Sequence, residues 1–388
     1  MKTITVVGAG MAGLTAAITC AEAGARVVLF EAHDAVGGRA RGLADTYGAN
    51  LGPHVLYAGG PLWRWLQQRS LLPETTTAPL SGIRLRWDGE LHRAPPLALI
   101  PATLRLRGRR APVDASFRDW ATRHADARTA ELLSAAAGVY TFHHDPGELS
   151  AAFVWERTVR TLLTPPPAAR YVAGGWSTLV AALEARARSL GVEIRLGERI
   201  TDVPAPPVIV ATELADARAL LRDDTLRWRS GHTVCIDLAL TRRRGDTFIV
   251  SDLDECGWVE RFTAADPTLA PAGEELVQAQ MPVRPGEDPD RAGARLEALL
   301  DLAFDDRRAR TVWRRRLVMK GRSGALDMPG ETWRDRPAVD RGDGVLLAGD
   351  CTAAPGLLSE VAWASGQEAS RCALELLRAA RPTLRRVA

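Results

Sequence analysis

Near its amino end the chain reads Thr3-Ile-Thr-Val-Val-Gly8-Ala-Gly10-Met-Ala-Gly13-Leu14. The β-branched residues up to Val7 predict a strand, and the Ala-rich run from Leu14 to Ala23 predicts a helix. The three glycines between them let the strand turn, let the backbone approach a pyrophosphate and let the helix pack against the sheet. The helix N-terminus also offers free N–H groups to phosphates. The stretch therefore predicts a dinucleotide site in an α/β, Rossmann-like domain.

A second strand is predicted at Arg26-Val-Val-Leu-Phe30, and Glu31 stands at its end, 18 residues beyond Gly13. A carboxylate at this position can accept hydrogen bonds from both ribose hydroxyls of an adenosine, and it would repel a 2′-phosphate. The pattern therefore favours FAD or NAD over NADP.

The composition narrows the class of protein. A chain of 388 residues favours two domains, and a net charge of +3 gives no field that favours nucleic acid as a partner. The five cysteines lie at scattered spacings without a C-x-x-C pair, so neither a metal site nor a disulfide framework is indicated. Glycines interrupt the apolar N-terminal run, and no uncharged stretch reaches the roughly 20 residues that span a bilayer. We expect a soluble, cytoplasmic protein.

The segment Ala35-Val-Gly37-Gly38-Arg39-Ala40 follows the strand-end glutamate. Here the chain resembles the superfamily of flavin amine oxidases, protoporphyrinogen oxidases and phytoene desaturases, in which Gly-Gly-Arg occurs at this place. Two glycines let the backbone pass close to a cofactor, and an arginine offers a charged fork to the pyrophosphate region. The resemblance implies FAD as the cofactor.

A similar resemblance is found near the other end of the chain. Gly344-Val-Leu-Leu-Ala-Gly349-Asp350 predicts a buried strand that ends in Gly-Asp, and a long helix is predicted from Leu358 to Ala380. The resemblance implies that Asp350 binds the ribityl chain and that the helix N-terminus faces the pyrimidine end of the flavin, where its dipole supports negative charge. Both ends of the chain are then expected to build one FAD site.

A third block lies between them. Tyr171-Val-Ala-Gly-Gly-Trp176-Ser-Thr-Leu179 precedes a predicted helix, and the resemblance implies that a strand near Ile200 to Val203 follows and contacts adenine. An apolar strand is predicted at Val208 to Ala211. We therefore expect an FAD-binding domain of the glutathione-reductase-like type, made of residues 1–51, 171–212 and 341–388. An inserted α+β substrate domain would comprise residues 52–170 and 213–340.

The substrate domain shows helical periodicity and several strand-like runs, with a stiff connection back to the first domain at Pro165-Pro-Pro167. Helices are predicted near Ala115 to Gly138 and Ala151 to Thr164, and strands at Thr233 to Leu240, Thr247 to Val250, Leu276 to Met281 and Val312 to Met319.

Two residues are candidates for catalysis. In Tyr47-Gly-Ala-Asn-Leu-Gly52-Pro53-His54 the resemblance implies passage along the isoalloxazine ring, with close approach at Gly52. His54 could act as a base near neutral pH, although a structural or solvent-facing histidine remains the alternative. Lys320 resembles the lysine that many flavin amine oxidases place near flavin N5, and a simple turn is the alternative there. For His143 and His144 two interpretations stay open: they line the substrate chamber, or they belong to an ordinary loop next to Pro146.

The expected FAD contacts come from all three blocks, and the cofactor is expected to be non-covalent because Cys351 neighbours the ribityl-binding Asp350 rather than the ring. They are Gly8, Gly10, Met11, Ala12, Gly13, Glu31, Ala32, Gly37, Gly38, Arg39, Gly52, Pro53, Ile200, Val203, Ala211, Gly349, Asp350, Leu357 and Leu358.

The resemblance implies an FAD-dependent oxidoreductase that transfers a hydride from its substrate to flavin N5. The stretch Asn50-Leu-Gly-Pro-His54 and the short chain are more similar to the phytoene-dehydrogenase-related branch, and the length favours a small or medium-sized hydrophobic metabolite over a full carotenoid. Three alternatives stay open: a flavin amine oxidase, a redox-neutral FAD-dependent polyene isomerase, and a non-catalytic escort-type binding protein of the same fold.

The segment from Pro95 to Arg110 combines an apolar run with four arginines. This combination is compatible with peripheral contact to an anionic membrane, and a solvated basic loop is the alternative because three prolines oppose a continuous amphipathic helix. The sequence leaves the oligomeric state open.

Overall fold

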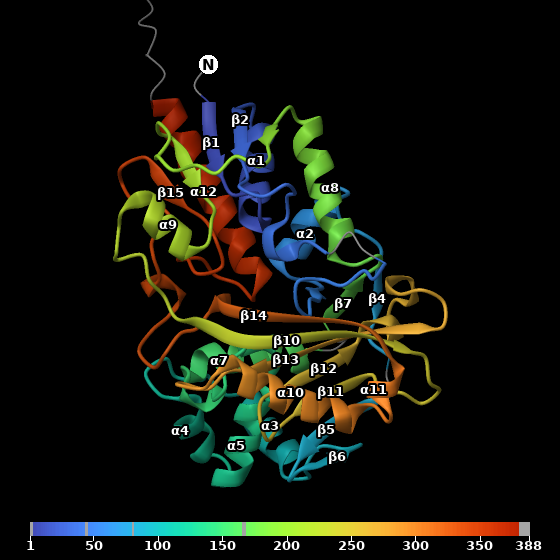
Figure 1. Cartoon of the computed structure of the whole chain (residues 1–388). Helices are drawn as coiled ribbons and strands as arrows, with labels where there is room; N and C mark the ends of the chain where they lie inside the picture. Colours follow the sequence, from blue (N-terminus) through green and yellow to red (C-terminus); the bar gives the residue numbers. More distant parts are fainter. Residues whose placement is uncertain (1–2, 43–45, 80, 165–167, 380–388) are drawn as a thin grey trace, which may run out of the picture.

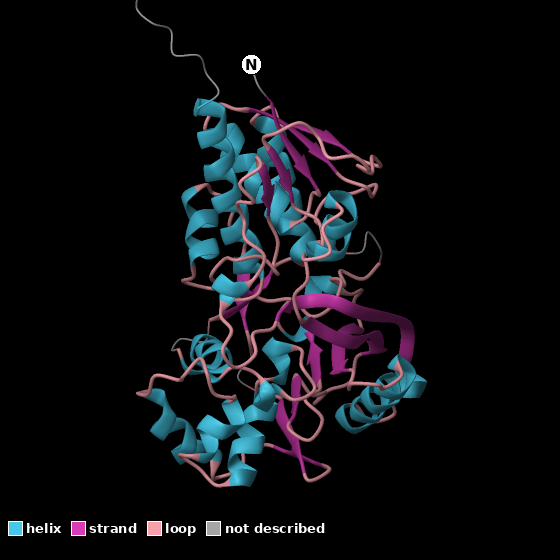
Figure 2. Cartoon of the chain, turned by 90° about the vertical axis from the view of Figure 1, so that its left-hand side faces the viewer, coloured by secondary structure: helices cyan, strands magenta, loops and turns pink. Residues whose placement is uncertain are grey.

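The computed structural model describes residues 3–42, 46–79, 81–164 and 168–379 (Figure 1). The described chain is a mixed α/β structure with a five-stranded sheet, a seven-stranded sheet and a small three-stranded sheet. In Figure 2 the parallel strands lie at one end of the molecule and a group of helices lies at the other. Two segments named above, Pro165 to Pro167 and the end of the C-terminal helix at Ala380, lie outside the described residues.

The five-stranded sheet is parallel and is built from three distant parts of the chain. Its order is β15-β9-β1-β2-β8, so the strand near the C-terminus and the strand near residue 209 join the two N-terminal strands. The predicted Rossmann-like α/β fold is thereby confirmed. The strands are β1 (Thr3–Val7), β2 (Arg26–Phe30), β8 (Glu193–Arg195), β9 (Val208–Val210) and β15 (Val345–Leu347).

Helices α1 (Met11–Glu22) and α12 (Ser359–Ala379) pack on this sheet, and α8 (Trp176–Ser189) packs against α1. Figure 1 shows α1 and α12, from opposite ends of the chain, side by side. A Cβ at Gly366 of α12 would lie 2.6 Å from the carbonyl oxygen of Ala12, so a glycine is required where these helices approach most closely.

The seven-stranded sheet separates the parallel sheet from the helical end (Figure 1). Its long strands β10 (Ser230–Thr241) and β14 (Thr311–Ala325) pair antiparallel. Val234, Ile236 and Leu238 of β10 face the apolar cluster that helix α10 (Pro289–Ala303) completes. The alternate residues therefore face the parallel-sheet domain. The other strands are β13 (Glu274–Pro282), β12 (Trp258–Arg261), β11 (Ile249–Asp252), β5 (Ile83–Trp87) and β6 (Glu90–His92).

The remaining elements connect the two sheets or form the helical end. The short strands are β3 (Leu56–Tyr57), β4 (Thr75–Thr77) and β7 (Ala169–Val172). The helices are α2 (Pro61–Gln68), α3 (Leu99–Arg107), α4 (Phe117–Thr122), α5 (Ala127–Ala136), α6 (Gly138–Thr141), α7 (Ala151–Thr158), α9 (Leu214–Leu221) and α11 (Arg307–Arg310).

Some predicted elements differ from the observed ones. The helix predicted over Ala115 to Gly138 is two helices, because Asp126 accepts a hydrogen bond from the N–H of Thr129 and starts α5 anew. The strand predicted near Ile200 to Val203 is wrong. That segment is irregular and runs into Pro204, whose ring nitrogen cannot donate to a sheet ladder.

Helix α2 lies in the part of the chain assigned above to the substrate domain, yet its apolar side chains pack in the core of the parallel-sheet domain. Leu62, Trp65 and Leu66 are buried there with residues of α1 and α8. No helix in the described part of the chain combines the length and the hydropathy that crossing a bilayer requires.

Candidate functional site

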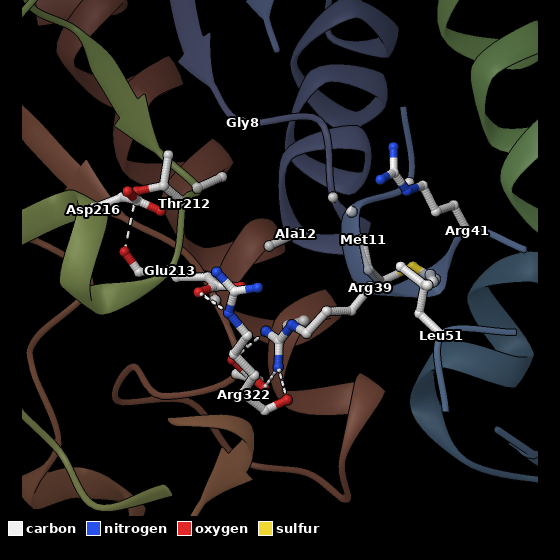
Figure 3. A pocket seen from close by; sticks show the side chains of 18 of the residues that line it. Gly8, Met11, Ala12, Arg39, Arg41, Leu51, Thr212, Glu213, Asp216 and Arg322 are labelled. Atoms are coloured by element: carbon white, nitrogen blue, oxygen red, sulfur yellow. Dashed lines mark hydrogen bonds and ion pairs between the residues drawn. The ribbon is translucent and has the colours of Figure 1, made fainter. Parts of the chain in front are cut away.

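A cavity of about 640 Å³ lies at the carboxyl ends of the parallel strands and extends to the seven-stranded sheet. This is the place where open α/β sheets bind ligands, and the volume falls within the roughly 300–1,000 Å³ of small-molecule sites. Figure 3 shows that residues from distant segments, among them Gly8, Arg39, Glu213 and Arg322, meet around it.

The three glycines of the first turn have different structural roles. Gly8 has φ +100°, and a Cβ there would lie 2.7 Å from the carbonyl oxygen of Ala211. A Cβ at Gly13 would lie 1.8 Å from the carbonyl oxygen of Gly8, whereas a Cβ at Gly10 would meet no atom within 4 Å. Gly8 and Gly13 are therefore required by the fold, and Gly10 opens the backbone to the cavity.

The N-terminus of α1 is available to a ligand. Gly10 is its N-cap and supplies no side-chain acceptor to the N–H groups of the first turn. Met11 and Ala12 of that turn line the cavity. Free N–H groups at a helix N-terminus form an anion site of the kind that holds a pyrophosphate.

Glu31 is held at the end of β2 by two backbone donors. Its Oε2 accepts a hydrogen bond from the N–H of Ala9 (2.8 Å), and its Oε1 accepts one from the N–H of His33 (3.0 Å). The side chain is buried and lines the cavity. Each carboxylate oxygen has a further lone pair, so both can accept ribose hydroxyls in a fixed orientation.

The Gly-Gly-Arg segment packs directly on the first glycine turn. Gly37 donates its N–H to the carbonyl oxygen of Ala9 (2.7 Å), and a Cβ at Gly38 would lie 3.3 Å from the Cα of Gly10. Both glycines have positive φ, +105° and +52°. The glycine pair is thus explained by two backbone segments that cross closely, as well as by access to the cavity.

Arg39 joins the two ends of the chain. Its Nη1 and Nη2 donate to the Asp350 carboxylate at 2.7 and 2.8 Å, and Nη1 also donates to the carbonyl oxygen of Arg322 (2.8 Å). Burial acts to raise the pKa of Asp350, but the charge and hydrogen bonds of Arg39 outweigh it and hold the pKa below the usual range. The sequence predicted that Arg39 and Asp350 each contact the cofactor, but it did not predict that they pair with each other.

The start of α12 closes the same part of the cavity. Ser365 accepts a hydrogen bond from the N–H of Gly349 (2.9 Å) and fixes the Gly-Asp turn on the helix. Leu358 and Ser359 line the cavity, and Leu358 adopts φ +52°, which is unusual for a residue with a side chain. The helix N-terminus is therefore directed at the cavity by a constrained turn.

The opposite end of the cavity has a different chemistry. We call the following residues the inner wall: His54, Phe142, Trp176, Thr233 and Cys235 of β10, Gln280 of β13 and Met319 of β14. None of these seven carries a carboxylate or a guanidinium. The pairing of β10 with β13 and β14 places the four strand residues side by side on one face of the sheet.

His54 lies on the inner wall with one ring nitrogen held by a backbone carbonyl. Its Nδ1 lies 2.7 Å from the carbonyl oxygen of Gly52, and its ring centroid lies 5.1 Å from that of Trp176. A carbonyl can only accept, so Nδ1 carries a proton, and in the neutral form of the ring Nε2 has a free lone pair. Burial, and then the positive charge of Arg39, lower the pKa of His54.

A buried network holds the segment around Asn50 against the seven-stranded sheet. The Gln278 side chain donates to the carbonyl oxygen of Asn50 and to the Asp237 carboxylate, both at 3.0 Å, and Arg315 contacts both groups. The Asn50 side chain accepts from the N–H of Trp176 (3.0 Å). The network therefore sets the positions of His54 and Trp176. Sequence analysis missed it, although Thr233, Cys235 and Asp237 alternate with Val, Ile and Leu and so signal a two-faced strand.

Several predicted residues lie elsewhere. Lys320 is exposed and follows Met319 on β14, and it is not among the residues that line the cavity. His143 and His144 do not line it either; with Glu148 they place ligand atoms within 4.8 Å of one another, the one such group in the described residues. Gly13, Val203 and Leu357 are also absent from the lining, which includes Ala32, Pro53, Ile200 and Ala211.

The comparisons with known proteins agree with this geometry. Residues 6–69 match the family described as an NAD(P)-binding Rossmann-like domain. A segment of 54 residues is 54% identical to hydroxyneurosporene desaturase from Rhodobacter capsulatus, and it covers 14% of this chain and 11% of that protein. The match thus spans about a tenth of the relative's length.

Two solved structures have the same fold over nearly the whole chain. An oxidoreductase from Methanosarcina mazei has a TM-score of 0.78 at 17% identity, with 95% of this chain and 100% of that one covered. Cyclohexylamine oxidase from Brevibacterium oxydans has a TM-score of 0.72 at 18% identity, with coverage of 97% and 99%. Together the comparisons confirm the predicted fold class and the resemblance to the amine oxidase, protoporphyrinogen oxidase and phytoene desaturase superfamily.

Proposed function

We propose that the chain is an FAD-dependent oxidoreductase that removes a hydride from an uncharged, largely apolar small or medium-sized substrate. The observation that carries this proposal is one continuous cavity with two chemistries. Glu31, Arg39 and Asp350 line one end, and the uncharged inner wall forms the other. A charged nucleotide and an apolar reactant would each meet the surface that suits it.

The residues present fit FAD. The open space over Gly10 and the uncapped N-terminus of α1 suit the pyrophosphate, and Glu31 presents two anchored oxygens to the adenosine ribose. Asp350 is the candidate for the ribityl hydroxyls, and the N-terminus of α12 lies at the same part of the cavity. When bound, FAD supplies the hydride-accepting chemistry, and the protein supplies binding, orientation and electrostatics.

The chain's own residues then act on the substrate through position and polarity. The inner wall excludes charge and water from the reacting group, and Thr233 and Gln280 offer hydrogen bonds that can orient one polar atom. His54 holds an unprotonated Nε2 and is the proposed proton acceptor. Lys320 has no role in this mechanism because it does not reach the cavity.

The inner wall favours a desaturase-like substrate over an amine. An ammonium group would meet no carboxylate on the inner wall, and burying an unpaired charge is costly. The desaturase is therefore the better guide to the reaction, and cyclohexylamine oxidase is a guide to the fold.

Dinucleotide titration of the purified chain tests the cofactor. We expect FAD to bind more tightly than NAD⁺ or NADP⁺. Glu31→Ala should weaken FAD binding by about tenfold, because it removes roughly one charge-assisted hydrogen-bonding group. Glu184→Ala, which removes a carboxylate of α8 outside the cavity, is the matched control and should leave the affinity unchanged. Preferential binding of NADP⁺, or an unchanged affinity in Glu31→Ala, would overturn the assignment.

A further inference from the structure

Helix α3 has apolar residues on two opposite faces. Leu99, Ala102 and Leu106 are buried in the core of the helical end. Ile100 and Leu104 are exposed and lie on the opposite face of the helix. Leu97, in the turn that precedes α3, is exposed as well and stands at the same spacing before Ile100.

The outward face is strongly exposed. Leu97 is 84% exposed, Leu104 63% and Ile100 52%. Single exposed apolar side chains are ordinary on protein surfaces, but an aligned row of three marks an interaction site. Helix α3 lies at the helical end of the molecule, remote from the parallel sheet (Figure 1).

Arginines flank the row. Residues 93–110 contain five arginines and no carboxylate, and Arg105, Arg107, Arg109 and Arg110 are all exposed. No ion pair between described residues involves any of these four. Arg105 donates to the carbonyl oxygen of His124 at 3.4 Å, and burial and then the charges of Arg109 and Arg123 lower the pKa of His124. The basic field therefore extends over the neighbouring loop.

The helix forms despite its prolines, contrary to the alternative of a solvated loop. Pro101 lies in the first turn of α3, where a missing N–H costs no intrahelical hydrogen bond. Pro95 and Pro96 precede the helix and therefore interrupt none of its hydrogen bonds. The segment therefore presents one rigid surface that combines apolar and basic groups.

We propose that this surface, formed by Leu97, the outward face of α3 and the four arginines in and after the helix, docks on the anionic headgroup region of a lipid bilayer. Leucine and isoleucine side chains would enter the interface, and the guanidinium groups would contact phosphates. A nucleic acid would satisfy the arginines and leave the apolar row without a partner. A symmetric contact with a second copy would bring identical arginine clusters face to face, which is electrostatically unfavourable.

The docking surface does not depend on the proposed redox function, because no residue of α3 lines the cavity. Docking would bring the chain to a bilayer, where it would encounter an apolar substrate. The two proposals can fail separately, since lipid binding is measured without turnover and cofactor binding without lipid.

Co-sedimentation of the full chain with vesicles tests the proposal. We expect binding to phosphatidylcholine vesicles that contain phosphatidylglycerol, weak binding to phosphatidylcholine alone, and loss of binding at high salt. The variant Leu97→Ser/Ile100→Ser/Leu104→Ser should bind at least about tenfold more weakly, because it removes the groups that enter the interface.

Variants that remove or keep the positive charge test the role of the four arginines. Replacing Arg105, Arg107, Arg109 and Arg110 by Gln should lower affinity for the anionic vesicles by up to about fivefold for each residue near the surface, and replacing them by Lys should retain most of it. The matched control is Leu302→Ser/Arg291→Gln, which alters an exposed apolar residue and an exposed arginine on α10. Circular dichroism shows whether each variant is folded.

Three results would overturn the proposal. The first is no sedimentation of the wild-type chain with anionic vesicles at low salt. The second is equal binding by the wild type, the α3 variants and the control. The third is a stable dimer in light scattering that the α3 variants dissociate, with no vesicle binding, which would assign the surface to a second copy of the chain.

Discussion

The two ends of the cavity are built on different principles. At the nucleotide end the backbone itself forms the site: Gly8, Gly13 and Gly37 stand where any side chain would collide with backbone or core atoms. At the inner wall the site is a set of side chains, and four of its seven residues stand on three strands whose backbone pairing is regular. A backbone constraint admits few residue types, so it leaves a motif that can be recognised in the sequence. A wall of packed side chains admits many combinations of residue types and leaves no such motif.

The largest expected effect breaks the nucleotide end. Gly13→Ala would place a Cβ 1.8 Å from the carbonyl oxygen of Gly8, so we expect a loss of about 3 kcal/mol in the free energy of unfolding, or no folded protein. Gly10→Ala would meet no protein atom within 4 Å, and we expect a folded chain with impaired FAD binding. Urea unfolding and FAD titration of both variants measure the difference. Equal stability of the two variants would contradict the division of roles.

This contrast also explains what could be predicted. The glycine turn, Glu31 and the Gly349-Asp350 pair were located from sequence because each satisfies a local backbone or charge requirement. The Arg39–Asp350 pair spans 311 residues, and no local pattern reveals it. Val203 was assigned to adenine contact by analogy, and in the structure it lies in an irregular segment that does not line the cavity.

The inner wall also depends on contacts between distant segments, which a local sequence pattern does not reveal. Strand periodicity predicted the strands that carry Cys235, Gln280 and Met319, but not which strands pair, so the wall could not be assembled from sequence. Lys320 was singled out because it resembles the lysine that flavin amine oxidases place near flavin N5, and strand alternation places it on the face away from Met319.

The second prediction concerns the link between the two chain ends. Asp350→Ala would leave the Arg39 guanidinium without its carboxylate, and we expect a loss of about 2 kcal/mol of stability, less than for a fully buried pair because both groups keep some exposure. Adding Arg39→Ala to it should cost little more. Fully additive losses in a double-mutant cycle would contradict a coupled pair.

The pair also has a pH signature. The pKa of Asp350 is lower in the folded chain than in the unfolded one, so its contribution to stability is present at neutral pH and is lost as the pH falls through the folded-state value. Acid unfolding of the wild type and of Asp350→Asn compares the two directly. A wild type whose stability is no more sensitive to acid than the variant's would argue against the pair.

A third prediction addresses the network behind the inner wall. Gln278→Leu removes the donor shared by Asp237 and the Asn50 carbonyl, and we expect about 1–3 kcal/mol of destabilisation from the buried acceptors left with fewer partners. Gln280 is the next residue of β13 on the same face, and Gln280→Leu should cost less because the Gln280 side chain donates only a long, 3.4 Å hydrogen bond to the carbonyl oxygen of Val139. Thermal unfolding of both variants provides the test, and a larger loss in Gln280→Leu would refute the assignment.

The smallest expected effect concerns His54. Its pKa is lowered in the folded chain, so as the pH falls below about 6.5 the unfolded state takes up the proton first and stability decreases until the folded-state pKa is reached. His54→Gln should lose this part of the pH dependence while retaining FAD. The same slope of stability against pH in both proteins would show that His54 is not the buried neutral base.

The central claim is that the two ends of one chain form a single FAD site. Native mass spectrometry of the purified chain, followed by denaturation and identification of the released molecule, tests it most directly. We predict one FAD per chain, released intact on denaturation and greatly reduced in Gly10→Ala and Glu31→Ala. A chain that carries NAD or NADP in place of FAD, or that binds no FAD when it is supplied in excess, would contradict the account.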